Sequence, residues 1–193
     1  MMNKKLVIGI AGITCSGKST LATKIQSLIP DSIILNQDDY FLPADDPRHV
    51  YIAELHHQNW DIITSVDMEK MYTDLLKWIN NDIEQSSPSV QTRVLILEGF
   101  LIFNYEPIAN LCNMKFFLTL NKEECWERRK ERSYDPPDVP GYFEMVVWPE
   151  YIRHKSELDQ NKKLYDSIVF IDGSRTQQDI FNIVSSAIIE RLA

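Results

Sequence analysis

One stretch constrains the fold more than any other. After an apolar run at residues 6–11 come Gly12, Ile13, Thr14, Cys15, Ser16, Gly17, Lys18, Ser19 and Thr20. The spacing G-x-x-x-x-G-K-S is typical of a loop that wraps phosphate groups between a buried strand and a helix. Glycines let the backbone curl so that its N–H groups point inward, and the helix N-terminus adds partial positive charge. The alternative, a glycine turn that merely joins strand to helix, would not need the complete pattern.

The rest of the chain repeats the alternation of strand and helix. Apolar runs at residues 5–11, 33–36, 93–97, 115–120 and 167–171 predict strands, and helical spacing predicts helices at about 18–28, 67–81, 106–111, 121–133, 142–163 and from 176 onward. Strands that alternate with helices predict an α/β fold, a five-stranded parallel sheet with helices on both faces and right-handed crossovers. We expect one domain over residues 1–193, with a small helical lid at about 121–141.

Two stretches between these elements are predicted to lie outside the sheet. Residues 42–64 are predicted to form a polar excursion that holds Pro43, Pro47 and the pair His56-His57, and residues 86–89 a surface loop. Thr64, Ser65, Val66 and Asp67 offer a capping box for the following helix. The three residues His56, His57 and His154 are predicted to lie on the surface.

Charge and cysteine content narrow the class of partner. The net charge of −8 argues against a nucleic-acid surface, which normally needs a basic face. No apolar stretch approaches the roughly 18–20 residues that span a bilayer, so we expect no membrane partner. Cys15, Cys112 and Cys125 lack metal-ligand spacing, and their odd number does not indicate a disulfide framework. A reducing, cytoplasmic compartment is the simplest expectation, and a cleaved leader would remove the first strand.

The phosphate loop predicts which residues perform phosphoryl transfer. Lys18 would reach the terminal phosphates of a bound nucleotide, and the Ser19 hydroxyl would hold Mg²⁺. A carboxylate from a strand end, either Asp38 or Glu98, would support that metal site. Glu98 follows an apolar run, but a capping or salt-bridging role explains the same pattern.

Asp38 is predicted to orient the attacking hydroxyl and accept its proton. Ligands collect at the carboxyl ends of parallel strands, which places Asp38 and Asp39 near the phosphate loop. In an extended segment adjacent side chains point to opposite sides, so the two carboxylates cannot serve equally. A solvated turn would also explain the pair.

Two further groups have both a functional and a structural interpretation. Arg128 and Arg132 lie four apart on one predicted helix face, with Arg129 turned away. They are either lid arginines that close over phosphates or part of a solvated helix paired with Glu124, Glu127 and Glu131. Trp60 and Asp61 suit a flat cationic ring through cation–π attraction and charge, although core packing explains Trp60 at least as well.

Five blocks together resemble the nicotinamide riboside kinases, in the uridine kinase-like branch of the P-loop kinases. They are residues 12–20, 37–41, 66–71, 97–105 and 136–143, read as GITCSGKST, QDDYF, VDMEKM, LEGFLIFNY and PPDVPGYF. The phosphate loop is shared by very many proteins, whereas the second, fourth and fifth blocks are more particular. The resemblance covers nearly the whole chain.

The resemblance implies ATP-dependent phosphorylation of the 5′-hydroxyl of nicotinamide riboside, giving the mononucleotide for NAD synthesis. It implies ATP and Mg²⁺ as cofactors, Asp38 as proton acceptor, and a metal site at Ser19, Asp38 and Glu98. Substrate contacts would be Asp38, Asp39, Tyr40, Phe41, Trp60, Asp61, Arg129, Tyr134 and Asp135. Nucleotide contacts would be residues 12–20 with Arg128, Arg132, Ser133, Tyr134, Asp172, Gly173 and Ser174.

The chain departs from the family pattern at two positions. Trp60 stands where the family commonly has tyrosine, and Asp135 is acidic. Both bear on substrate preference and leave the kinase activity untouched, so a uridine or cytidine kinase stays open as an alternative. A non-catalytic nucleotide-binding switch is a separate alternative, which would keep the phosphate loop without turnover. We expect a small-molecule nucleoside and ATP as partners, and a monomer or weak homodimer.

Overall fold

Five parallel strands form the centre of the molecule in a computed structural model that describes residues 4–81 and 92–192. The order across the sheet is β2 (Ile33–Asn36), β5 (Thr92–Glu98), β1 (Lys4–Gly12), β6 (Met114–Thr119) and β7 (Val169–Asp172). Every pairing is parallel, and β1 in the middle pairs with both β5 and β6. The predicted five-stranded parallel sheet is confirmed. The loop predicted at residues 86–89 lies outside the described residues.

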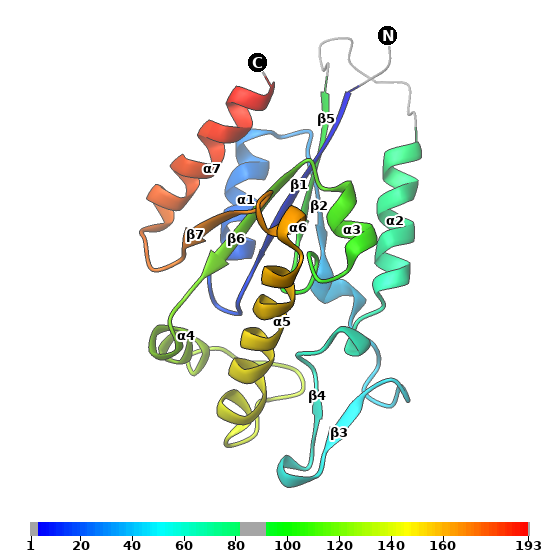
Figure 1. The fold of residues 1–193 in the computed structure, drawn as a ribbon, viewed down its shortest axis with the longest axis vertical. Coiled ribbons are helices and arrows are strands. Elements are labelled where there is room, and N and C mark those ends of the chain that lie inside the picture. Colours follow the sequence, from blue (N-terminus) through cyan, green and yellow to red (C-terminus); the bar gives the residue numbers. More distant parts are fainter. Residues whose placement is uncertain (1–3, 82–91, 193) are drawn as a thin grey trace.

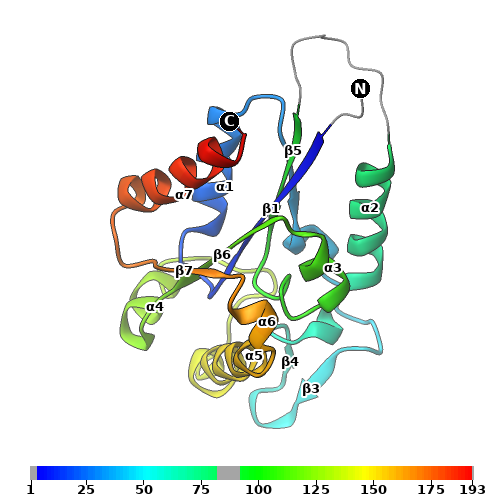
Figure 2. The ribbon, with the colours of Figure 1, turned by 45° about the horizontal axis from the view of Figure 1, so that its top comes forward.

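Successive side chains along each strand point to opposite faces of the sheet. Both faces therefore carry apolar side chains, and helices cover both. Leu6, Ile8 and Ile10 of β1 pack against α1 (Lys18–Leu28) and α7 (Gln177–Leu192) on one face. On the other face Val7 and Ala11 pack in a core with α2 (Met68–Asn80), α3 (Glu106–Leu111) and α5 (Trp148–Gln160). Figures 1 and 2 show this three-layer arrangement, with α1 and α7 on the side opposite α2 and α3.

The hairpin at residues 50–59 and α4 (Lys122–Arg129) lie at the carboxyl ends of the strands (Figure 1). Residues 42–64 were predicted only as a polar excursion, but they contain the antiparallel hairpin of β3 (Val50–Ile52) and β4 (His57–Asn59). Strands of three residues are too short to show a recognisable period, and β4 is polar throughout, which explains why the hairpin was missed. The segment Gln37–Tyr40 is a 3₁₀ turn rather than extended chain, and the Asn36 side chain caps it by accepting the Asp38 N–H.

The charged helix predicted at 121–133 is shorter than expected. The observed helix, α4, begins at Lys122 and ends at Arg129. Arg132 therefore lies beyond the helix and does not share a helix face with Arg128. Apart from Cys125, α4 buries only Arg129, and the helix ends where that guanidinium turns inward to its partners. The helix predicted over 142–163 is interrupted too, because a π-helical turn, Phe143–Val147, precedes α5, and α6 (Lys162–Tyr165) is separate. Pro149 sits in the first turn of α5, where a missing N–H is harmless.

The helix caps are partly as predicted. Thr176 caps the start of α7, because its side-chain oxygen accepts the Asp179 N–H at 3.1 Å while its hydroxyl donates to the Asp179 carboxylate at 2.6 Å. At α2 the predicted box is wrong: residues Ile63–Ser65 form a 3₁₀ turn, and Asp67 alone caps the helix by accepting from the Lys70 N–H. Among residues 4–81 and 92–192, no helix combines the length and apolar character needed to cross a bilayer.

Candidate active site

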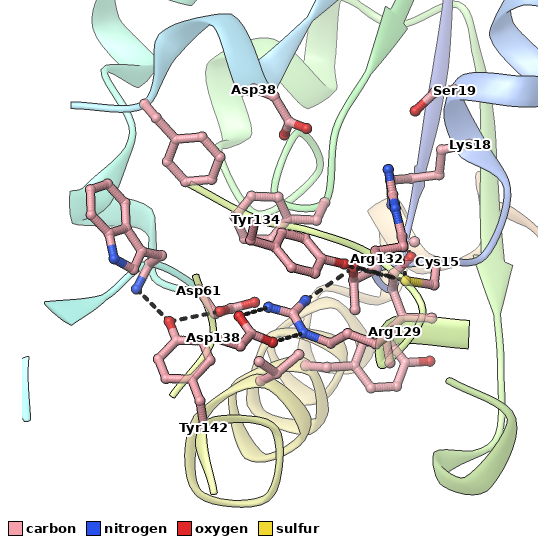
Figure 3. A pocket seen from close by; sticks show the side chains of 18 of the residues that line it. Cys15, Lys18, Ser19, Asp38, Asp61, Arg129, Arg132, Tyr134, Asp138 and Tyr142 are labelled. Atoms are coloured by element: carbon pink, nitrogen blue, oxygen red, sulfur yellow. Dashed lines mark hydrogen bonds and ion pairs between the residues drawn. The ribbon is translucent and has the colours of Figure 1, made fainter. Parts of the chain in front are cut away.

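A cavity of about 480 Å³ opens at the carboxyl ends of the strands. The phosphate loop, between β1 and α1, forms one wall, and the residues after β2, β4, β5 and α4 form the others. A second cavity, of about 460 Å³, lies on the other side of the same loop. Both are lined by Cys15, Lys18, Ser19 and Arg132. One loop therefore separates two binding spaces, and Figure 3 shows the first of them.

Two glycines give the phosphate loop its shape. Gly12 has a φ of 138°, and a Cβ there would lie 2.2 Å from the Leu118 carbonyl oxygen, so no side chain fits. Gly17 has a φ of 95° and forms the N-cap of α1. Lys18, the first residue of α1, donates from Nζ to the Ile13 carbonyl at 2.9 Å. Burial lowers the pKa of Lys18, and the carboxylates of Glu98 and Asp38 oppose that shift.

Ser19 and Glu98 form the centre of a possible cation site. The Ser19 hydroxyl donates to Glu98 Oε1 at 2.8 Å, and Glu98 is buried at the end of β5. Burial raises the pKa of Glu98, which the Ser19 hydrogen bond and the charge of Lys18 counteract. In the part of the chain that the structure describes, no three His, Cys, Asp or Glu side chains cluster as a protein-only metal cage. A hydroxyl with one or two carboxylates fits Mg²⁺, which takes its other ligands from phosphates and water.

Asp38 faces the first cavity and Asp39 does not. Figure 3 shows the Asp38 carboxylate and the Lys18 side chain pointing into the same space. Asp39 is exposed and outside both cavities. Tyr40 is buried, and its hydroxyl donates to Asp74 at 3.2 Å. Of the substrate contacts implied for residues 38–41, the structure therefore brings only Asp38 and Phe41 to the cavity.

The far end of the first cavity is aromatic and acidic. Trp60 lines it, with its ring edge-on to Phe41 at 5.9 Å between centroids, and it also packs against the neighbouring core cluster. The core-packing interpretation of Trp60 is therefore correct in part, and its contact with a cationic ring stays a prediction. Asp61, Tyr134 and Asp135 line the same space, as does Ser133.

Asp61 is held by residues that the sequence did not single out. Tyr142 donates its hydroxyl to Asp61 at 3.0 Å and accepts the Trp60 N–H at 2.8 Å. His154 was predicted on the surface, but it is buried, lines the cavity, and bonds the Asp61 carbonyl oxygen at 2.8 Å. The prediction failed because His154 faces inward from α5 over a sequence separation of 93 residues. Burial raises the pKa of Asp61, opposed by the charge of Arg129.

The second cavity gathers arginines around the phosphate loop. Arg128 donates to the carbonyl oxygens of Cys15 at 3.2 Å and Gly173 at 3.1 Å, and it pairs with Glu124 as the structural interpretation expected. Gly173 lines this cavity, while its neighbours Asp172 and Ser174 form a turn in which Asp172 accepts the Ser174 N–H. The closing motion of a lid stays a prediction.

Arg129 is the buried arginine of the group, with 6% of its side chain exposed. It binds both Asp138 oxygens, at 2.7 and 2.9 Å, and the Thr14 hydroxyl at 3.1 Å. Asp138 lies in the proline-rich block and was not predicted as a site residue. Others missed in the same cavity are Phe100, Asn104, Phe117, Pro136, Tyr142, Val147, Tyr151 and His154. The available signal was their place in the resemblance blocks at 97–105 and 136–143, which hold Phe100, Asn104, Pro136, Asp138 and Tyr142.

Three features together define a P-loop kinase, which is a phosphotransferase. They are a phosphate loop after the central strand β1, carboxylates at the carboxyl ends of the neighbouring strands β2 and β5, and arginines of the short helix α4 that face the cavities. Comparison with known proteins agrees. Residues 8–149 match a family model described as an AAA domain. Nicotinamide riboside kinase 1 of Rattus norvegicus is 38% identical, with 98% of this chain and 96% of that protein covered. The corresponding human protein is 35% identical, with 98% and 95% covered.

The chain belongs to the nicotinamide riboside kinase family, which confirms the resemblance found in the sequence. A uridine kinase of Borrelia hermsii is more distant, at 30% identity over 66% of each chain. A solved structure titled as a possible uridine kinase from Bacillus stearothermophilus superposes with a TM-score of 0.56 at 14% identity, covering 89% of this chain and 91% of that one. This likeness concerns the fold.

Proposed function

We propose that the protein transfers the γ-phosphoryl group of ATP to the 5′-hydroxyl of nicotinamide riboside, giving the mononucleotide used for NAD synthesis. The observation that carries the proposal is the first cavity, which joins the phosphate loop to a pocket of aromatic and acidic side chains. Trp60 and Tyr134 offer ring faces, and Asp61 offers negative charge, to a flat pyridinium cation. The names of the full-length relatives support the same substrate.

The residues divide the work of phosphoryl transfer. ATP would lie along the phosphate loop, with its base toward the second cavity near Gly173, and Arg128 and Arg132 beside its phosphates. Lys18 would leave the Ile13 carbonyl to bind the terminal phosphates. Asp38 would hold the acceptor hydroxyl in line and take its proton. When bound at Ser19, Asp38 and Glu98, Mg²⁺ would neutralise charge on the phosphates.

The cellular compartment and the binding partners of the protein are also proposals. We place the enzyme in the cytoplasm because Cys15, Cys112 and Cys125 are free thiols, as a reducing compartment favours. We expect it to act on small molecules, without nucleic acid or membrane, as a monomer or weak homodimer.

The test is a side-by-side comparison of kcat/KM for nicotinamide riboside and uridine with ATP and Mg²⁺. A neutral pyrimidine is recognised by hydrogen bonds to its edge, whereas the pyridinium ring carries positive charge. We expect a clear preference for nicotinamide riboside. A preference for uridine would establish a pyrimidine nucleoside kinase instead, and no ATP consumption with either nucleoside would favour a non-catalytic switch.

Replacing Trp60 by alanine is expected to raise the KM for nicotinamide riboside roughly 5- to 30-fold, which corresponds to about 1–2 kcal/mol of lost stacking and cation–π attraction. Because such contacts bind the ground state and the transition state alike, kcat should change little. Trp60→Phe, which keeps an aromatic face, is the matched control. An unchanged KM in Trp60→Ala would show that Trp60 serves only the core.

Tyr142→Phe is expected to make nicotinamide riboside binding more sensitive to acid. Burial already raises the pKa of Asp61, and the Tyr142 hydroxyl, Arg129 and His154 counteract that shift while Asp138 adds to it. Loss of the hydroxyl raises this pKa further, so Asp61 becomes neutral at higher pH and loses its attraction for the cation. The acidic limb of the kcat/KM profile should move upward by about one pH unit. A limb that stays in place, in a variant whose thermal unfolding shows a folded protein, would contradict this role for Asp61.

A further inference from the structure

The hydroxyl of Thr14 connects the phosphate loop to the opposite wall of the first cavity. Arg129 lies in that wall, and all three of its guanidinium nitrogens donate hydrogen bonds. Nε and one terminal nitrogen donate to the Asp138 carboxylate, and the other terminal nitrogen donates to Thr14 Oγ1 at 3.1 Å. The ring of Tyr134 lies 4.2 Å from the guanidinium carbon. Figure 3 shows the Arg129 guanidinium between Asp138 and Tyr134.

The direction of these hydrogen bonds is fixed by arginine, which can only donate. Thr14 Oγ1 therefore accepts from Arg129, and its own hydrogen is free to point at the Tyr134 hydroxyl oxygen, 3.3 Å away, or at Cys15 Sγ at 3.5 Å. One hydroxyl thus contacts both Arg129 and Tyr134. The other anchor of Arg129, Asp138, comes from the proline-rich loop.

Thr14 differs from the loop residues that follow it. Residues 15–20 all border the second cavity, on the nucleotide side, whereas Thr14 borders only the first. Its side chain is therefore turned toward the space assigned to the acceptor. A residue of the phosphate loop contributes here to the other substrate's site.

We propose that Thr14 is a positioning residue for the acceptor nucleoside, which holds Arg129 and Tyr134 in place through its hydroxyl. The inference rests on the proposed function, in which the nucleoside lies in the first cavity that Arg129 and Tyr134 line. Without the hydroxyl, a buried guanidinium N–H loses its acceptor, and an unsatisfied charged donor is costly. Arg129 then shifts to find another partner, and the tyrosine ring that packs on it shifts as well.

The experiment compares Thr14→Val, which keeps the branched shape and removes the hydroxyl, with Thr14→Ser, which keeps the hydroxyl. We expect Thr14→Val to raise the KM for nicotinamide riboside about 10-fold, the size of one lost hydrogen bond to a charged group. The KM for ATP should stay within about 2-fold, and Thr14→Ser should restore the acceptor KM. Calorimetric titration of nicotinamide riboside into the enzyme with AMP-PNP should show the same loss in affinity.

Two controls separate this role from a general weakening of the fold. Thr23→Val makes the same change at an exposed position of α1 and should leave both KM values unchanged. Asp138→Asn loosens Arg129 from its other anchor, so it should give the same selective rise in acceptor KM. If Thr14→Val is unstable, Asp138→Asn and Thr14→Ser still test the cluster.

The inference is overturned if Thr14→Val raises the KM for ATP as much as that for the acceptor, or if Thr14→Ser behaves like Thr14→Val. Failure of the proposed function is a separate result, visible in the wild-type enzyme as a lack of nicotinamide riboside phosphorylation. If uridine proves to be the acceptor, the same comparison with uridine tests Thr14, because Arg129 and Tyr134 line the cavity in either case.

Discussion

Asp38→Asn is expected to lower kcat at least about 100-fold, the lower range for loss of a positioned acid–base group. Asparagine has nearly the same shape, so the fold and the cavity should survive. What it lacks is the negative charge that, in the proposed function, would orient the acceptor hydroxyl, accept its proton and support a cation site beside the Ser19–Glu98 hydrogen bond. Because a carboxylate beside Mg²⁺ is a weak base, most of the loss comes from misplacement of the hydroxyl in a loose transition state.

Asp39→Asn is the matched control for this prediction. Both residues lie in the same 3₁₀ turn and both are exposed, but only Asp38 lines the cavity. Steady-state kinetics with nicotinamide riboside and ATP should therefore show a much smaller loss for Asp39→Asn. The reverse order would mean that the turn moves on substrate binding and that Asp39 is the working carboxylate. A structure with both substrates bound, in which Asp38 pointed away from the 5′-hydroxyl, would exclude its assigned role.

The sheet was predictable because its strands carry their signal locally. β1 and β5 are continuous apolar runs, as expected of strands covered on both faces, and each ends at a residue with phosphate or metal chemistry. Parallel strands bring such ends to one edge, so the meeting of Lys18, Asp38 and Glu98 followed from topology alone. The β3–β4 hairpin lacked any such pattern, since its strands have three residues each and face no deep core.

The wall of the first cavity opposite the phosphate loop was less predictable, because its contacts join residues far apart in sequence. Tyr142 reaches Asp61 across 81 residues and Arg129 reaches Thr14 across 115. Helical spacing turned Arg129 away from Arg128, which is correct, but it also placed Arg132 on the face of Arg128, which is wrong because α4 ends at Arg129. It gave no sign that Arg129 is the buried one. Burial of an arginine depends on a partner such as Asp138, and no local pattern in one sequence reveals the partner.

Lys18→Met is expected to reduce kcat about 10²- to 10³-fold, comparable to the loss of one preorganised donor at the site of developing charge. Lys18 is the side chain best placed to follow the migrating phosphoryl group, because it starts at the first residue of α1 and lies beside Asp38 and Glu98. Burial lowers its pKa, while those two carboxylates favour its charged form. A bound triphosphate would add more negative charge and so favour the charged form of the lysine further.

Methionine fills the space of the lysine stem without its charge, so the melting temperature should change by only a few degrees while turnover collapses. Lys77→Met, which makes the same change on α2 outside both cavities, should cost no more than about 5-fold, as expected for a solvent-screened charge. A kcat for Lys18→Met within tenfold of wild type would mean that Arg128 and Arg132 neutralise the phosphates by themselves. Lys18 would then keep its hydrogen bond to the Ile13 carbonyl during the reaction. Its role would be to stabilise the phosphate loop rather than to contact the nucleotide.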